Sequence, residues 1–264
     1  MSNRDRKPKM SSEKLIKEKC PQIGITFNHI SEEEAIALIK EKNNFLRMAA
    51  YRKNYRKQEP NKGNGKHYIN LDFSYLYELS LLDMYLRHII TRMCIDVEHA
   101  LKVSLIQAIE EDDNEDGYEI VKDYIAGQND QGDYVLKSLC RKSTSSYTGS
   151  LICKNFTVEE YKEDDKIKKK ITRYDDCPAW VFVEVLSFGE FLQFYSFAVK
   201  ELKINEMDYK VLNQIRSLRN GCAHNNCLIA NLADYESNAP KLISNAVSKM
   251  ENISPSQRRK KLRN

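Results

Sequence analysis

Apolar residues recur at steps of three and four along most of the chain, and this spacing predicts helices. The clearest stretch runs from Asp72 to about Ile109. It contains neither glycine nor proline, and it predicts one long central helix. Ser31 and Glu34 have the spacing of a capping box, so a shorter helix should begin there. Residues 44–57 predict a following helix with a basic face.

The C-terminal half carries three more predicted helices. An apolar and aromatic segment, residues 178–199, predicts a largely buried helix with Pro178 in its first turn. Further helices should span about residues 206–232 and about residues 239–251. We find no alternating-strand pattern and no internal repeat, so the expected fold class is all-α.

A polar region, residues 110–176, interrupts this helical pattern. Its glycines, its serine-rich stretch and its mixed-charge run predict shorter helices and an irregular insertion, least ordered near residues 141–172. The expected organisation is therefore an N-terminal helical segment over residues 1–70, a helical domain over residues 71–253 that contains this insertion, and a basic tail over residues 254–264.

Composition supports a reduced, helical protein. With 9 Gly and 6 Pro, the chain has few of the residues that punctuate a β-sandwich or a barrel. Its seven Cys are an odd number and form no C-x-x-C pair, which indicates free thiols and no structural zinc. No metal and no cofactor are expected. Neither a signal peptide nor an uncharged run long enough for a transmembrane helix is evident, so we expect a cytoplasmic protein without a membrane partner.

Positive charge is concentrated at particular places. The net charge is 42 − 38 = +4, and the last eleven residues carry five basic groups and no acidic one. Such clusters suit contact with phosphate backbones, although solvated ends are the simpler interpretation of the tail. The candidate RNA-binding residues are Arg47, Arg52, Lys53 and Arg56 of the predicted 44–57 helix, and Arg258, Arg259, Lys260 and Lys261 of the tail.

The strongest candidate chemistry lies in the segment L-N-Q-I-R-S-L-R-N-G-C-A-H-N-N-C, residues 212–227. Arg219 and His224 are five residues apart on the predicted helix. Arginine offers a permanently cationic fork for phosphate, and histidine can give or take a proton near neutral pH. Together they fit RNA cleavage, in which a 2′-OH attacks the adjacent phosphorus. The spacing alone is a weak pattern, and a helix with an exposed arginine and a satisfied histidine also explains it.

R-N-G-C-A-H, residues 219–224, resembles the R-N-x-x-A-H signature of the Abi family of bacterial abortive-infection proteins (AbiD/AbiF-like), which belongs to the HEPN superfamily of helical ribonucleases. Other segments resemble the same family in the same order. They are K-P-K-M-S-S-E-K-L-I-K-E-K (7–19), N-N-F-L-R-M-A-A-Y (43–51), L-S-L-L-D-M-Y-L-R (79–87), V-E-H-A-L-K (97–102) and P-A-W-V-F-V-E-V-L-S-F-G (178–189). The resemblance spans roughly residues 7–235.

The resemblance implies a HEPN-like helical bundle with extra N-terminal helices and a ribonuclease site. In such a site, two R-x-x-x-x-H motifs meet across a symmetric dimer. Because this chain has one motif, a composite active site would require a second copy. Arg219 and His224 would be the catalytic pair, with Asn220 as the polar residue after the arginine. Asp83, Arg87 and Glu98 would be supporting residues. Many members have a second histidine after the motif, where this chain has asparagine.

The leading hypothesis is a metal-independent endoribonuclease of an abortive-infection or toxin-antitoxin phage-defence system, with RNA as substrate and an RNA or protein antitoxin as a further partner. The alternative is a non-catalytic RNA-binding or protein-interaction module of the same fold, which would not depend on His224. A thiol enzyme that uses Cys222 with His224 is disfavoured, because residues two apart on a helix point about 200° apart.

Overall fold

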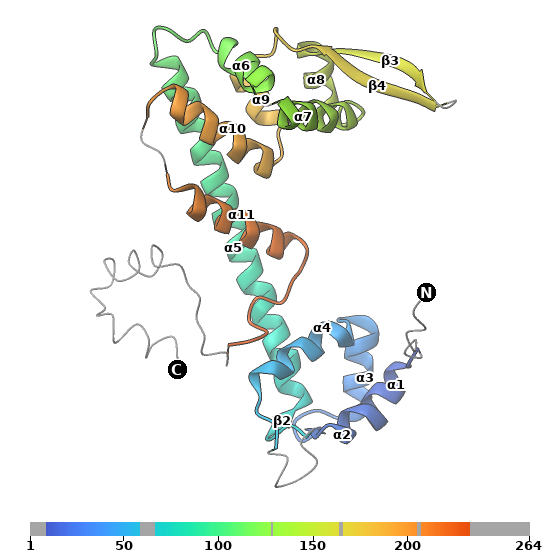
Figure 1. The fold of residues 1–264 in the computed structure, drawn as a ribbon. Helices are drawn as coiled ribbons and strands as arrows, with labels where there is room; N and C mark the ends of the chain where they lie inside the picture. The colour runs from blue at the N-terminus through green and yellow to red at the C-terminus, as the bar shows by residue number, and fades with distance from the viewer. Residues whose placement is uncertain (1–8, 59–66, 128, 164–165, 205–206, 233–264) are drawn as a thin grey trace, which may run out of the picture. The chain divides into compact units, whose positions relative to one another are not determined.

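The computed structural model describes residues 9–58, 67–127, 129–163, 166–204 and 207–232. Within these ranges the fold is mostly helical, as the sequence predicts, and strands occur only in two two-stranded sheets (Figure 1). The chain divides into two compact units. Unit 1 comprises residues 1–91 and 220–264, and unit 2 comprises residues 92–219. Among the described helices, none combines the length and apolarity needed to cross a membrane.

Unit 1 is built from short helices and the first part of one long helix. Its elements are α1 (Ser12–Lys14), the π-helical turn η1 (Leu15–Lys19), α2 (Cys20–Gln22), β1 (Ile25–Thr26), α3 (Glu32–Glu41), α4 (Phe45–Ala50), the 3-10 turn η2 (Tyr51–Asn54), β2 (Leu71–Asp72) and the start of α5 (Phe73–Glu110). The strands β1 and β2 pair in parallel. A core of fully buried side chains holds these elements together, and it includes Ile16, Met48, Tyr51, Leu71 and Phe73.

Local sequence signals explain where the helices of unit 1 begin. The capping box of α3 is confirmed: the Glu34 amide donates to the Ser31 hydroxyl at 3.2 Å, and the Ser31 amide donates to the Glu34 carboxylate at 3.0 Å. Asn44 caps α4. The predicted 44–57 helix is wrong in length, because the backbone becomes extended at Tyr55 after α4 and η2.

The long helix α5 is confirmed. The buried carboxylate of Asp72 precedes it and accepts from the Ser74 amide at 3.0 Å and the Asn28 amide at 2.6 Å. Burial opposes ionisation of Asp72, but the hydrogen bonds from Asn28, Ser74 and Thr26 outweigh it and lower the pKa of this carboxyl. The result is a charged cap that also ties α5 to the segment after β1.

Unit 2 contains the remainder of α5, the helices α6 (Glu119–Gly127), α7 (Asn129–Lys142), α8 (Gly149–Asn155), α9 (Ala179–Val185) and α10 (Phe188–Glu201), most of α11 (Tyr209–Ala223), and the strands β3 (Thr157–Glu163) and β4 (Lys166–Arg173). Its core is aromatic, with Tyr124, Phe182, Phe191 and Phe194 fully buried. Three of these rings, those of Tyr124, Phe182 and Phe194, meet edge to face.

Two expectations for unit 2 are wrong. The segment expected to be irregular forms an antiparallel hairpin of β3 and β4, with Tyr161 opposite Lys168. Its strands are charged on both faces, so they show no apolar alternation. The single helix expected over residues 178–199 is also wrong. The chain instead forms α9 and α10, because Ser187 starts a new capping box with Glu190, and Pro178 is the N-cap of α9.

Candidate active site

The helix that carries the motif ends within the motif. Sequence spacing predicts a helix to about Leu232, but α11 ends at Ala223. The amide of Asn225 donates to the Cys222 carbonyl at 2.9 Å, and the amide of Asn226 donates to the Gly221 carbonyl at 2.8 Å. Asn225 is left-handed, with φ of 57°. These features define a Schellman motif in which His224 is the C-cap, so the longer helix is a wrong expectation.

The three predicted catalytic residues therefore lie in and directly after the last turn of α11. Arg219 is half-buried on the helix, whereas Asn220 and His224 are exposed. The His224 amide donates to the Asn220 carbonyl at 2.9 Å, which continues the helical hydrogen bonding by one residue. No described atom approaches Gly221 closely enough to require a glycine, since an added Cβ would lie 3.9 Å from Leu228. The imidazole is thus presented to solvent from a defined backbone position.

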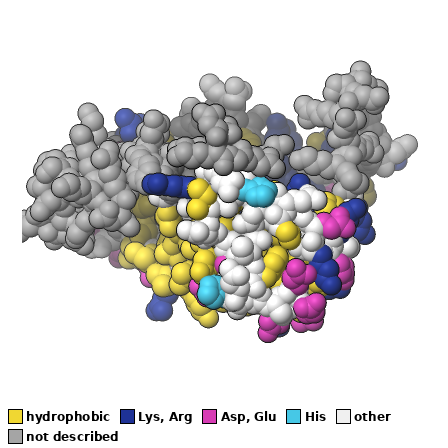
Figure 2. Space-filling view, turned by 90° about the horizontal axis from the view of Figure 1, so that it is seen from below, with side chains coloured by type: hydrophobic (Ala, Val, Ile, Leu, Met, Phe, Trp, Pro, Cys, Tyr) yellow, Lys and Arg dark blue, Asp and Glu magenta, His cyan; other side chains and the backbone are white. Residues whose placement is uncertain are grey.

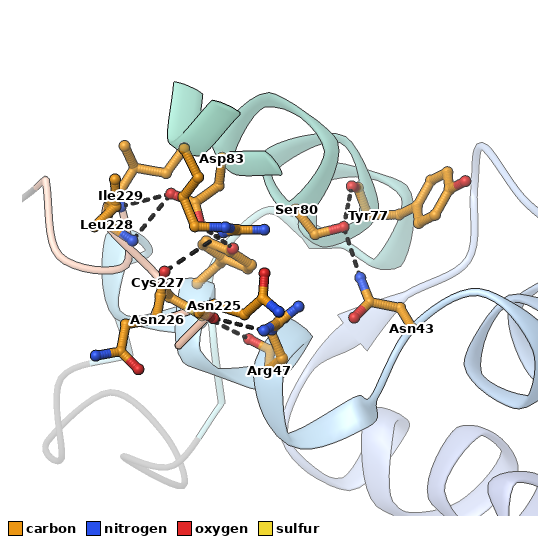
Figure 3. Close-up of polar contacts among 12 residues, drawn as sticks. Asn43, Arg47, Tyr77, Ser80, Asp83, Asn225, Asn226, Cys227, Leu228 and Ile229 are labelled. Carbon is orange, nitrogen blue, oxygen red and sulfur yellow. Dashed lines mark hydrogen bonds and ion pairs between the residues drawn. The ribbon is translucent and has the colours of Figure 1, made fainter. Parts of the chain in front are cut away.

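The irregular segment after His224 is held by hydrogen bonds from η2 and from α4, and Figure 3 shows the contact from Arg47 of α4. The Arg47 guanidinium donates to the Asn225 carbonyl at 2.5 Å. The Asn54 amide group donates to the Ile229 carbonyl at 2.8 Å, and its oxygen accepts from the Leu232 amide at 2.6 Å. These contacts occupy backbone groups that no helix satisfies, so they fix the chain directly after the motif.

Asp83 is the centre of this arrangement. Its carboxylate is fully buried and accepts hydrogen bonds from the backbone amides of Leu228 and Ile229 at 3.0 and 3.1 Å (Figure 3). It also accepts from the Tyr51 hydroxyl at 2.8 Å and pairs with the guanidinium of Arg87, which is 4% exposed. A buried carboxylate with four donors is well satisfied, and the Asp83–Arg87 pair therefore anchors the segment after His224 to α5.

Arg87 and Tyr51 complete the anchor. The Arg87 guanidinium reaches the Asn226 carbonyl at 3.4 Å, so one arginine contacts both the buried acid and the segment after the motif. Burial raises the pKa of the Tyr51 hydroxyl, and the neighbouring Cys227 and Asp83 raise it further. Tyr51 is thus a neutral donor to Asp83. Tyr51 and Asn54 are not among the site residues predicted from the sequence, although Tyr51 lies in the segment 43–51 that resembles the Abi family.

The other predicted residues have different surroundings. Glu98 lies in unit 2 and forms an ion pair with Lys102, four residues on, at 3.8 Å, and this pair is separate from the Asp83 anchor. Arg52 is half-buried, donates to the Ala49 carbonyl at 2.9 Å and lies over the Tyr68 ring. Lys53 and Arg56 are exposed. The tail residues Arg258, Arg259, Lys260 and Lys261, like the helix expected near 239–251, lie outside the described residues.

Charge on the described surface of unit 1 is mixed. Figure 2 shows acidic, basic, hydrophobic and histidine side chains close together on the face that it draws. Among the described residues, no group of three or more His, Cys, Asp or Glu side chains is arranged to hold a metal ion. The described part of the site therefore offers cations, an imidazole and backbone groups.

A family model described as Abi-like protein matches residues 39–230, which is more than half of the chain. The matched range begins in α3 and ends in the segment anchored by Asp83. No curated protein and no solved structure matches the chain.

Proposed function

The chain belongs to the Abi-like protein family, and from this premise we propose that it is an endoribonuclease of a bacterial abortive-infection or toxin-antitoxin phage-defence system. Its substrate is RNA, and the catalytic residues are Arg219, His224 and Asn220. The observation that carries the proposal is the placement of His224: an exposed imidazole at a helix C-cap, followed by backbone that a buried ion pair anchors.

The proposed reaction needs no metal ion. The 2′-oxygen of the RNA forms a bond to the adjacent phosphorus, and the bond from phosphorus to the 5′-oxygen breaks. The 2′-OH gives up its proton to water, and His224 in its protonated form donates a proton to the leaving 5′-oxygen. Arg219 offsets the negative charge that develops on the phosphoryl oxygens. Asn220, exposed one turn before His224, can donate a hydrogen bond to the same phosphate. The products are a 2′,3′-cyclic phosphate and a 5′-hydroxyl.

A second copy of the chain completes this site in the proposal, because one guanidinium and one imidazole are sparse for phosphoryl transfer. The exposed face of α5 supports the dimer. Leu82, Tyr85 and Ile89 recur at steps of three and four, and each is at least 60% exposed. A helix stripe of this kind is typical of a surface that another chain covers.

The nuclease is tested by incubating purified protein with RNA in EDTA and identifying the product ends. His224→Ala should lower the cleavage rate by about 10²- to 10⁴-fold and leave RNA binding intact. His99→Ala, at another exposed histidine, is the matched control and should cut normally. Cleavage by His224→Ala within about threefold of wild type would contradict the proposal and favour a non-catalytic RNA-binding or protein-interaction module. So would activity that requires magnesium and leaves 5′-phosphates.

The dimer is tested by light scattering at assay concentration. Tyr85→Glu with Ile89→Glu places two charges in the apolar stripe and should give an inactive monomer. Leu46→Glu changes another exposed apolar residue, 80% exposed on α4, and should remain dimeric. A wild-type protein that is monomeric while it cuts RNA would overturn the composite site.

An RNA or protein antitoxin is a further proposed partner, and co-purification from cells that carry the neighbouring genes tests it.

A further inference from the structure

A groove runs between α7 and the edge of the β3–β4 hairpin, entirely within unit 2. The helix packs along β4, as Figure 1 shows. Two adjoining depressions form the groove, one of about 350 Å³ and one of about 470 Å³. Both are lined by Lys137, Cys140, Tyr161 and Lys169. The sequence predicts only an irregular insertion in this region, with no function of its own.

The lining of this groove is strongly basic. Lys137 and Arg141 are one helical turn apart on α7, so both point from the same face of the helix. The strand β4 adds three consecutive lysines, at positions 168–170. Of the acidic residues that the structure describes, none lines either depression. The carboxylate of Glu160 contacts Lys169 at 3.4 Å and balances one of the charges.

Like charges that share a groove repel one another, and a polyanion that enters the groove removes this repulsion and releases counterions. The groove also presents apolar surface beside the cations. The Tyr161 ring is 44% exposed at the groove, and Ile167 is 73% exposed next to it. Burial raises the pKa of the Cys140 thiol, so this lining side chain is uncharged near neutral pH. Cations next to an exposed aromatic ring match the phosphates and bases of a single-stranded nucleic acid.

We propose that this groove binds single-stranded RNA, with Lys137, Arg141 and Lys170 on the phosphates and a base stacked on Tyr161. The inference rests on the proposed function in one respect, since it takes RNA rather than DNA as the ligand. It adds a binding surface in unit 2 to the candidate residues of α4, η2 and the tail. A strand needs no defined sequence to bind here, because the lining offers charge and stacking instead of base-specific donors.

The test measures binding without cleavage, by fluorescence anisotropy of a labelled single-stranded RNA of about 16 nucleotides. All variants carry His224→Ala, so that the RNA stays intact. Lys137→Gln with Arg141→Gln should weaken binding on the order of tenfold and should reduce the slope of log affinity against log salt by about 1.4. The matched control is Lys200→Gln with Lys210→Gln, which removes the same charge from two exposed lysines on α10 and α11 and should leave both quantities unchanged.

A second pair of variants tests stacking. Tyr161→Leu should weaken binding by about 5- to 100-fold, whereas Tyr161→Phe keeps the ring and should bind as the parent does. Tyr147→Leu removes a tyrosine that is 91% exposed outside the groove lining and serves as the control. Circular dichroism establishes that each variant is folded.

Three outcomes would overturn the inference: a groove variant with the affinity and salt slope of its control, equal binding by Tyr161→Leu and Tyr161→Phe, or equally tight binding of a glutamate-rich peptide that Tyr161→Leu does not weaken. The last result would identify an acidic protein as the partner. Failure of the proposed nuclease looks different, because a protein that never cuts RNA can still bind it in this groove with the expected salt slope.

Discussion

In each unit a buried carboxylate lies beside a cation, Asp83 beside Arg87 and Glu190 beside Lys142, and the two carboxylates have different roles. Asp83 in unit 1 accepts from the backbone of Leu228 and Ile229, which lie about 145 residues away in the chain. Glu190 in unit 2 accepts at 2.7 Å from the amide of Ser187, three residues before it, and at 2.7 Å from the Lys142 ammonium group. Asp83 therefore positions an irregular segment, whereas Glu190 mainly begins its own helix.

The cations differ in the same sense. Arg87 is 4% exposed and has its charge balanced inside the protein, whereas the Lys142 side chain is 27% exposed and can reach water if its partner is removed. Removing one partner of a buried ion pair lowers the free energy of unfolding strongly, because the other charge stays buried. The Asp83–Arg87 pair therefore holds the backbone next to His224 in a fixed position. Under the proposed function, the segment after His224 belongs to the functional site, whereas the α10 cap belongs to the scaffold.

The largest effect is expected at Asp83. Asp83→Asn leaves the Arg87 charge buried without its partner, and this should lower the free energy of unfolding by about 3–5 kcal/mol in urea denaturation. Amide exchange at Leu228 and Ile229 should accelerate. Asp96→Asn, at an exposed position of α5, is the control and should be nearly neutral. A loss no larger than that of the control would mean that the anchor does not hold the segment.

Glu190→Gln should cost less, about 1.5–3 kcal/mol of unfolding free energy, because glutamine keeps the capping box and Lys142 can become hydrated. Urea denaturation measures the loss, and Glu184→Gln, whose side chain is 57% exposed beside Lys102, should change stability by less than about 1 kcal/mol. Cleavage of RNA by Glu190→Gln at a temperature where it is folded should match wild type. A selective loss of activity would remove the distinction between the two acids.

The Glu190 cap should also respond to acid. Burial opposes ionisation of Glu190, but hydrogen bonds from Lys142, Ser138 and Ser187 lower the pKa of its carboxyl in the folded state. The unfolded state then binds the proton more readily, so this stabilisation is present above the unfolded pKa of about 4.3 and is lost as pH falls through the folded pKa. The free energy of unfolding should fall more steeply below about pH 4.3 in wild type than in Glu190→Gln. Parallel curves would show that Glu190 contributes nothing to acid stability.

The smallest effect concerns the turn that ends α11. Asn225 has φ of 57°, a conformation that glycine adopts without the steric cost of a Cβ. Asn225→Gly should raise the free energy of unfolding by up to about 1 kcal/mol, whereas Asn225→Ala should lower it by about the same amount. Thermal unfolding of both variants measures the difference. Equal stability of the two would mean that the left-handed residue is not what ends the helix.

Sequence alone determined the features that depend on neighbours a few residues away. The capping box at Ser31, the uninterrupted periodicity of α5 and the position of the R-N-x-x-A-H motif on α11 are all readable locally. The two wrong predictions for unit 2 arise because local patterns carry no signal for these features. The β3–β4 hairpin is charged on both faces, and the break at Ser187 lies inside a continuous apolar run, so periodicity gave no sign of either.

Tertiary contacts determine where the helix that carries the motif ends and what holds the chain after it. Residues 224–232 continue a plausible helical pattern, yet their backbone groups bond to Asp83, Arg47, Arg87 and Asn54, which are distant in sequence. A hydrogen bond to a buried carboxylate competes successfully with a helical bond, because leaving that carboxylate unsatisfied would cost more than one turn of helix contributes. The helix therefore ends at Ala223 and leaves the His224 side chain exposed. The contacts that decide this come from residues distant in sequence, so neighbouring residues alone do not predict it.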